Sequence, residues 1–165
     1  MYKGLNLNVL EDKKMNISDK GIRFIKNFEG FSPTWYKDSK GVWTIGFGHA
    51  GSLSERYNIQ RINEQTAIKI LQNDLSQAED IINRLVKIDL TQNQFDALTS
   101  FVFNVGSGNF SNSTLLKRLN EGKFEEVINE FLRWNKITYK GKKVELKGLT
   151  KRREKESKLF LTGEY

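Results

Sequence analysis

Three side chains in the first third of the chain have the types and spacing needed for acid–base chemistry. Glu29 and Asp38 are carboxylates nine residues apart, and the hydroxyl of Thr44 follows six residues later. Hydrolysis of a glycosidic bond requires a protonated carboxylic acid on one side of the bond and a second carboxylate, as base or nucleophile, on the other. These residues are therefore candidates for the catalytic group of a glycoside hydrolase.

Glu29 falls on the apolar stripe of a predicted first helix over residues 18–29. Ser18 suits the N-cap of this helix, and Ile22 and Ile25 share the stripe with Glu29. Partial burial and the negative end of the helix dipole both favour the neutral form, which can donate a proton. A solvated glutamate is expected on the polar face instead, so the position of Glu29 favours a functional role.

Asp38 and Thr44 each have a simpler interpretation as well. Asp38 is followed three residues later by Gly41, a pattern that is typical of a tight turn. Residues 42–45 (Val-Trp-Thr-Ile) are predicted to form a strand, in which Thr44 faces away from its two apolar neighbours. A turn aspartate and a solvent-facing strand threonine account for these two residues without any catalytic role.

The hydrophobic pattern predicts a mainly helical chain with one small β-containing lobe. Between residues 36 and 62 the helical period is absent and four glycines appear. Helical spacing returns after Asn63 as the apolar stripe of a long helix, and residues 91–94 have the pattern of a capping box for the next helix. The stripe comprises Ile68, Leu71, Leu75, Ala78, Ile82 and Leu85; shorter helices are predicted over residues 113–120, 123–133 and 148–161, and a hairpin or irregular loop over residues 137–146.

These elements predict an α+β fold in a single domain over residues 17–165. A β-lobe at about 36–62 and a helical lobe of residues 63–165 plus the first helix would be linked by the long helix, with a cleft between them. Residues 1–16 are interpreted as an N-terminal extension. No stretch resembles a signal peptide or a membrane span, so we expect a cytoplasmic protein that another factor releases.

The composition predicts a folded protein that needs no cofactor. Of the 165 residues, 38% are hydrophobic and only one is proline, which is typical of a globular chain. The sequence contains no cysteine, which excludes disulfides, a cysteine nucleophile and thiolate metal sites. The single His49 cannot build a histidine-rich metal site, so we expect neither a metal nor a cofactor.

The net charge of +7 is concentrated near the C-terminus. Residues 136–158 contain ten Lys or Arg and three Glu, an excess equal to the whole net charge. A basic patch of this kind attracts polyanions, so an anionic cell envelope and nucleic acid are both candidate partners. A solvated helix face with loop lysines is the simpler alternative.

The two carboxylates and the threonine belong to a longer pattern that resembles the phage-type lysozymes, glycoside hydrolase family 24. This family has a Glu that ends the first helix, an Asp or Cys in the following turn, and a Thr in a Thr-Ile-Gly-x-Gly-His strand. Glu29, Asp38 and Thr44 match these three positions. The resemblance covers residues 17–163 and continues, in the family's order, in residues 100–110, 113–116, 133–134 and 148–160.

The resemblance implies a muramidase that cleaves the β-1,4 bond between N-acetylmuramic acid and N-acetylglucosamine in peptidoglycan. It implies that Glu29 is the proton donor and that Asp38 and Thr44 position and activate a water on the opposite face of the sugar, usually with inversion. Such an enzyme acts as an endolysin that lyses bacteria, and the missing signal segment favours release through a holin lesion. We expect a monomer that binds the glycan strand.

The resemblance also assigns supporting residues around this group. Phe103, Asn104 and Ser113 fall where the family lines its sugar cleft, although Phe103 also suits a core position and Ser113 a helix cap. His49 and Asp74 match positions that pair in some members, and this pair would fix the β-lobe to the long helix.

Arg152 matches an arginine that reaches the catalytic glutamate in this family. A guanidinium close to Glu29 favours the ionised carboxylate, whereas burial and the helix end favour the neutral acid. Our hypothesis is that the pair orients Glu29 in the free enzyme, and that bound glycan restores its acidity by excluding water.

Three alternatives remain open at this point. A lytic transglycosylase would use the substrate's own 6-hydroxyl in place of water, and would need neither Asp38 nor Thr44. A non-catalytic cell-wall binder would keep the cleft without the chemistry, which the intact Glu29, Asp38 and Thr44 argue against. A nucleic-acid-binding protein rests on the basic patch alone, with no recognised module, so we expect no nucleic-acid partner.

Overall fold

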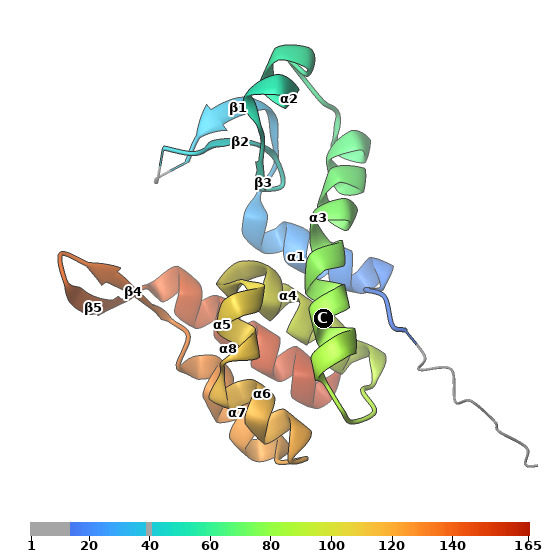
Figure 1. The fold of residues 1–165 in the computed structure, drawn as a ribbon, viewed down its shortest axis with the longest axis vertical. Helices are drawn as coiled ribbons and strands as arrows, with labels where there is room; N and C mark the ends of the chain where they lie inside the picture. Colours follow the sequence, from blue (N-terminus) through green and yellow to red (C-terminus); the bar gives the residue numbers. More distant parts are fainter. Residues whose placement is uncertain (1–13, 39–40) are drawn as a thin grey trace, which may run out of the picture.

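The computed structural model describes residues 14–38 and 41–165, which form a small β-containing lobe and a larger helical lobe (Figure 1). Helix α3 (Glu64–Leu85) runs from the small lobe into the large one, as its apolar stripe predicts. The predicted α+β fold class is confirmed. The small lobe contains β1 (Ser32–Lys37), β2 (Trp43–Gly46), β3 (His49–Ala50) and α2 (Leu53–Asn58); the large lobe contains α1 (Asp19–Glu29), α4 (Gln92–Val105), α5 (Ser107–Ser111), α6 (Thr114–Asn120), α7 (Phe124–Leu132), β4 (Lys136–Tyr139), β5 (Lys142–Glu145) and α8 (Lys147–Thr162).

The small lobe differs from the prediction in two places. Strand β1 begins at Ser32, before the predicted boundary at residue 36; it is the edge strand of an antiparallel β1-β2-β3 sheet, where Pro33 is tolerated. Helix α2 lies in the segment for which no helix was predicted. None of its residues is buried, so it has no apolar stripe, and its start is marked by a capping box between Ser52 and Glu55.

Apart from α5, for which no helix was predicted, the helices of the large lobe lie close to their predicted positions. Ser18 caps α1 by accepting a hydrogen bond of 3.0 Å from the backbone N–H of Gly21, and α6, α7 and α8 agree with the predicted ranges to within one residue at each end. The segment for which the sequence predicts a hairpin or an irregular loop is the β4–β5 hairpin. Its turn residues Lys140 and Gly141 both have positive φ, as a two-residue hairpin turn requires.

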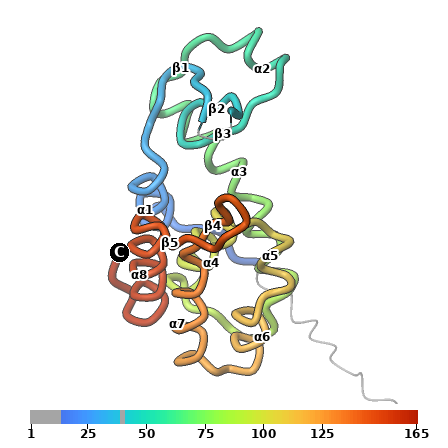
Figure 2. Tube along the Cα trace, turned by 90° about the vertical axis from the view of Figure 1, so that its left-hand side faces the viewer, coloured from blue at the N-terminus to red at the C-terminus, as the bar shows by residue number. Residues whose placement is uncertain are grey.

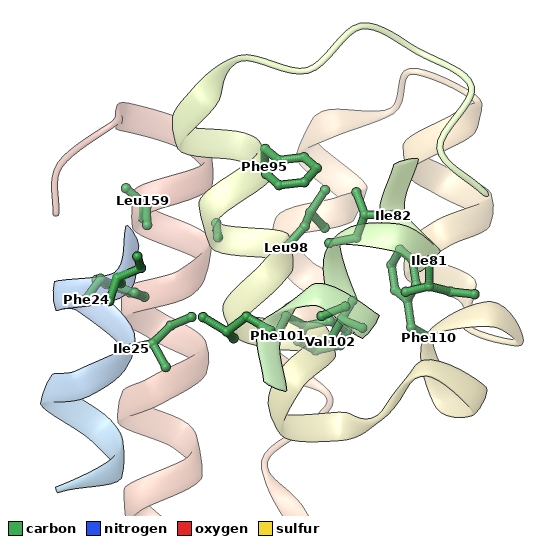
Figure 3. Packing of buried hydrophobic residues seen from close by; sticks show 14 of the residues in the cluster. Phe24, Ile25, Ile81, Ile82, Phe95, Leu98, Phe101, Val102, Phe110 and Leu159 are labelled. Atoms are coloured by element: carbon green, nitrogen blue, oxygen red, sulfur yellow. The ribbon is translucent and has the colours of Figure 1, made fainter. Parts of the chain in front are cut away.

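Helix α4 is the centre of the large lobe. Its residues 95–102 are all buried, and α1, α3, α5 and α8 pack against it. Although α1 comes first in the chain, it therefore belongs to the lobe formed by the C-terminal helices, beside α8 (Figure 2). Figure 3 shows the side chains that meet around α4, among them Phe24, Ile25, Ile81, Ile82, Phe95, Leu98, Phe101, Val102, Phe110 and Leu159.

Asp96 of α4 anchors the start of α1. The buried carboxylate accepts hydrogen bonds from the backbone N–H of Ser18 (3.0 Å), from the Ser18 hydroxyl and from the Tyr165 hydroxyl (2.6 Å). A Cβ atom added to Gly21 would lie 2.6 Å from Cγ of Asp96. The two helices can therefore approach this closely only because residue 21 has no side chain.

The N-terminal extension predicted for residues 1–16 falls mostly outside the described residues, which begin at residue 14. Met15 is held along α3, because its backbone N–H donates to the Asn83 side chain (2.9 Å) and its carbonyl accepts from the same amide (2.8 Å). The backbone N–H of Ile17 donates to Glu79 of α3 at 2.7 Å. These bonds guide the chain into α1.

His49 of β3 connects the small lobe to α3. Its Nδ1 lies 2.8 Å from Asp74 Oδ2, and its Nε2 lies 3.2 Å from Glu55 Oε1. Burial opposes protonation of the imidazole, but hydrogen bonds and charge interactions with Asp74 and Glu55 outweigh burial and raise the pKa of His49. Hydrogen bonds from Ser52, together with the His49 contact, lower the pKa of Glu55 to about 2.

We expect Gly21→Ala to destabilise the protein by about 1–3 kcal/mol, because the added methyl group clashes with the Asp96 carboxylate. The matched control is Gly148→Ala, in the first turn of α8, where an added Cβ has no neighbour within 4 Å. Urea denaturation measures both. Equal stability of the two variants would contradict the close approach of α1 and α4.

We expect the stability of the protein to fall as pH rises through the raised pKa of His49, because that pKa lies above its unfolded value of about 6.5. The contribution of the charged imidazole is fully present below about pH 6.5, and Glu55 does not titrate in this range. Asp74→Asn should largely remove the pH dependence in urea denaturation between about pH 5.5 and pH 8.5. Asp80→Asn, which changes an exposed carboxylate of the same helix, should leave it intact.

Candidate active site

Glu29 is the last residue of α1 and lies where the large lobe meets the small one. Its side chain is 19% exposed, and its Oε1 accepts a hydrogen bond of 2.6 Å from Nη1 of Arg152. Its Oε2 faces the β2–β3 turn, where a Cβ added to Gly48 would lie 3.3 Å away. The chain leaves α1 through Gly30, whose φ of 67° favours glycine. The carboxylate is therefore held by one lobe and bordered by the other.

Asp38 directly follows β1, and Thr44 lies on the neighbouring strand β2. Asp38 is tied to Val42 twice, because its backbone N–H donates to the Val42 carbonyl (2.9 Å) and its Oδ1 accepts from the Val42 N–H (2.8 Å). Thr44 pairs with Tyr36, two residues before Asp38. Because cross-strand partners point to the same side of a sheet, Thr44 shares one face with Tyr36.

Thr44 is buried, with 4% of its surface exposed, and it does not face open solvent as the simpler interpretation of this strand residue supposed. Its hydroxyl donates a hydrogen bond of 3.1 Å to the carbonyl of Val42. This bond fixes the rotamer and leaves the oxygen lone pairs as acceptors. The Thr44 hydroxyl oxygen can therefore accept a hydrogen bond from a donor such as a water molecule.

A cavity of about 330 Å³ lies between the lobes. Residues 48–50 of the small lobe form one side, and residues of α3 and α4, including Asp74 and Phe103, form the other. Phe103 is half-buried and lines this cavity, and its contact with a sugar stays a prediction. The His49–Asp74 contact predicted from the resemblance is present at its edge.

Asn104 and Ser113 have partners inside the protein. The exposed Asn104 accepts a hydrogen bond of 2.8 Å from Nη2 of Arg153. Ser113 caps α6, with its hydroxyl accepting from the Leu116 N–H (3.0 Å) and donating to the Phe110 carbonyl (2.7 Å). Substrate contact by either residue stays a prediction, and for Ser113 the helix-cap alternative is directly observed.

Glu29 contacts a buried charged cluster that consists of Arg152, Arg153 and Glu156. The sequence predicted a role for Arg152 alone. Arg152 is 5% exposed, and beyond Glu29 it contacts Glu156 through Nε at 3.0 Å. Glu156 and Arg153 are both fully buried, with Glu156 Oε2 lying 2.8 Å from Arg153 Nε. Burial raises the pKa of Glu156 and lowers the pKa of Arg153 to about 10. The spacing of Arg153 and Glu156 on one helix suggests an ion pair, but it carries no signal of burial.

The basic patch is smaller than its sequence suggests. Arg152, Arg153 and Glu156 are buried and do not contribute a charged surface. Eight lysines between residues 136 and 158 are exposed, together with Glu145 and Glu154, on the β4–β5 hairpin and the outer face of α8. The patch is therefore made of lysine alone.

Neither a metal-binding group nor a membrane-spanning helix occurs in residues 14–38 and 41–165. No cluster of three or more His, Asp and Glu side chains there could hold a metal ion. Over the same residues, every helix is too short or too polar to cross a bilayer.

Comparisons with known proteins identify the family of the chain. The family model described as phage lysozyme matches residues 26–156. The endolysin of Bacillus phage B103 is 49% identical over 152 residues, which are 91% of this chain and 56% of that protein. The chain therefore spans little more than half the length of this relative.

Two solved structures match this chain over nearly its whole length and over nearly the whole length of their own chains. The endolysin from Escherichia coli O157:H7 phage FAHEc1 has a TM-score of 0.86 and 36% identity, covering 92% of this chain and 96% of that one. The muramidase domain of SpmX from Asticaccaulis excentricus has a TM-score of 0.82 and 39% identity, covering 89% and 98%. Together with the family model, these similarities place the chain in the phage lysozyme family.

Proposed function

We propose that the chain is an endolysin muramidase that hydrolyses the β-1,4 bond between N-acetylmuramic acid and N-acetylglucosamine, with Glu29 as the general acid. The observation that carries the proposal is the position of Glu29 between the lobes, with one oxygen bound by Arg152 and the other beside Gly48. The relatives named as endolysins and the structure named as a muramidase domain support the same substrate class. Release to the wall through a holin lesion stays a prediction.

In the proposed reaction, Glu29 transfers its proton to the glycosidic oxygen as the bond to C1 breaks, so the leaving sugar departs as a neutral alcohol. Asp38 accepts a proton from a water whose oxygen bonds to C1 from the opposite face. Thr44 orients that water, because its hydroxyl hydrogen is engaged by Val42 and its oxygen is left as an acceptor. The anomeric centre is inverted.

Arg152 has two opposed effects on this reaction. Its hydrogen bond fixes the Glu29 carboxyl in one rotamer, which reduces the entropy cost of reaching the transition state. Its charge favours the ionised carboxylate, which cannot donate a proton. Glycan bound in the cleft excludes water, and in that environment the neutral acid becomes more favourable.

We expect Glu29→Gln to lower wall-clearing activity by roughly 100- to 10,000-fold while the protein stays folded, because glutamine cannot donate the proton. The measurement is turbidity loss of purified cell walls, with circular dichroism as the check of folding. The matched control is Glu64→Gln, an exposed glutamate that pairs with Lys26, which should keep full activity. If Glu29→Gln clears walls as well as the unchanged chain does, the effect is one of binding and the proposal fails.

Mass spectrometry of the released fragments separates hydrolysis from transglycosylation in the same digest. Hydrolysis leaves a reducing muramic acid end, because water supplies the oxygen on C1. A transglycosylase leaves a 1,6-anhydro end and needs no second carboxylate. Anhydro products would overturn the roles proposed for Asp38 and Thr44.

The lysine patch is proposed to hold the enzyme near an anionic cell envelope through long-range attraction. We expect the double variant Lys142→Glu and Lys143→Glu, on the exposed β5 strand, to reduce wall clearing several-fold at low salt. Turnover of a small soluble glycan should be unchanged. The control is the double variant Lys87→Glu and Lys117→Glu, which makes the same charge change at exposed residues outside the patch. Equal losses of wall clearing in the two double variants would refute a role for the patch.

A further inference from the structure

Glu156 is a fully buried carboxylate that contacts two arginines and one hydroxyl. Its Oε1 accepts from Arg152 Nε (3.0 Å) and from the Ser100 hydroxyl (2.7 Å), and its Oε2 lies 2.8 Å from Arg153 Nε. Ser100 comes from α4, whereas both arginines share α8 with Glu156. A carboxylate that is completely removed from water has a large desolvation cost, which its partners must offset.

The two arginines extend from Glu156 to two different side chains. Arg152 reaches Glu29 through Nη1 at 2.6 Å and stacks over the Phe28 ring at 4.8 Å. Arg153 reaches Asn104 through Nη2 at 2.8 Å and lies over the Phe101 ring at 5.0 Å. Glu156 therefore contacts both arginines. Arg152 continues to Glu29, the proposed acid, and Arg153 continues to Asn104, a predicted sugar-binding residue.

We propose that Glu156 is a positioning residue, which orients Arg152 toward Glu29 and Arg153 toward Asn104, and which offsets part of the positive charge that acts on Glu29. This inference rests on the proposed function of Glu29. Glu156 itself does not touch the substrate. Its effect on the reaction passes through the two guanidinium groups.

The charges around the cluster support this role. Glu29 faces the Arg152 charge and, more weakly, that of Arg153, and Glu156 is the carboxylate that offsets them. Helix α4 contributes only neutral groups here, namely Ser100, Phe101 and Asn104. Without the Glu156 charge, both guanidinium charges would act on Glu29 unopposed and would favour its ionised form.

The cluster is not arranged for stability alone. Nη1 of Arg153 is buried and has no hydrogen-bond partner in the described part of the chain. A buried donor without a partner costs stability, and a buried ion pair can often be replaced by apolar side chains at little cost. The arrangement is therefore better explained by the directions that it imposes on the two guanidinium groups than by its contribution to folding.

Glu156→Gln tests the proposal, because glutamine keeps the shape and the Ser100 hydrogen bond but removes the charge. With soluble peptidoglycan fragments as substrate, we expect kcat to fall roughly 10- to 100-fold as Glu29 loses its fixed geometry. We also expect the alkaline limb of the pH profile to move about one unit toward lower pH. The NMR-detected titration of the Glu29 carboxyl should move in the same direction, without any dependence on turnover.

The second variant is Glu156→Asp, which retains the charge and shortens the side chain. It also tests the proposal if Glu156→Gln does not fold. It should keep the pH profile of the unchanged chain, with a smaller loss of kcat. Leu159→Ala, a buried residue of the same helix outside the cluster, is the control for lost stability. It should lower the unfolding midpoint without moving either pH readout.

Several outcomes would overturn the proposal. The first is that the Glu29 titration of Glu156→Gln is the same as that of the unchanged chain. The second is that Glu156→Asp or Leu159→Ala shifts the Glu29 titration as much as Glu156→Gln does. If the unchanged chain does not hydrolyse the fragments, the proposed function has failed, whereas the NMR titration still reports on the positioning of Glu29. The two failures are therefore distinguishable.

Discussion

The guanidinium of Arg152 carries a full charge in a place that water hardly reaches. That charge is tolerable only if carboxylates and carbonyls surround it, and these come from three helices: Glu29 from α1, the Ser100 carbonyl from α4, and Glu156 from α8 itself. The apolar packing of α1, α4 and α8 brings these groups together. The position of the proposed acid is therefore a result of how the large lobe packs.

The small lobe carries Asp38 and Thr44, the other two residues of the proposed site. It buries Ile45 and Phe47 in the apolar core, and directional bonds add to this packing, such as His49 to Asp74 and the Trp35 indole to the Ile59 carbonyl at 2.6 Å. The close approach of Gly48 to Glu29 sets how near the sheet comes to α1. The small lobe is thus held by apolar packing and by the contact between His49 and Asp74, which responds to pH.

Sequence patterns predicted the features that depend on neighbours along the chain. Ser18 indicated the start of α1, and the apolar stripe indicated the length of α3, because caps and periodicity are local signals. Strand β1 and helix α2 were missed, since Pro33 obscures an edge strand and α2 buries none of its residues. The burial of Arg153 and Glu156 was also missed, because it depends on contacts with α4, about fifty residues away.

Glu29 and Arg152 are separated by 123 residues, yet they meet in one hydrogen bond. During synthesis on the ribosome α1 emerges before α4 and α8, the helices that hold the groups against which it packs. A nascent chain that ends before residue 147 contains Glu29 without the guanidinium that binds it. The Glu29 carboxyl can therefore reach the arrangement of the folded protein only after α8 has been translated.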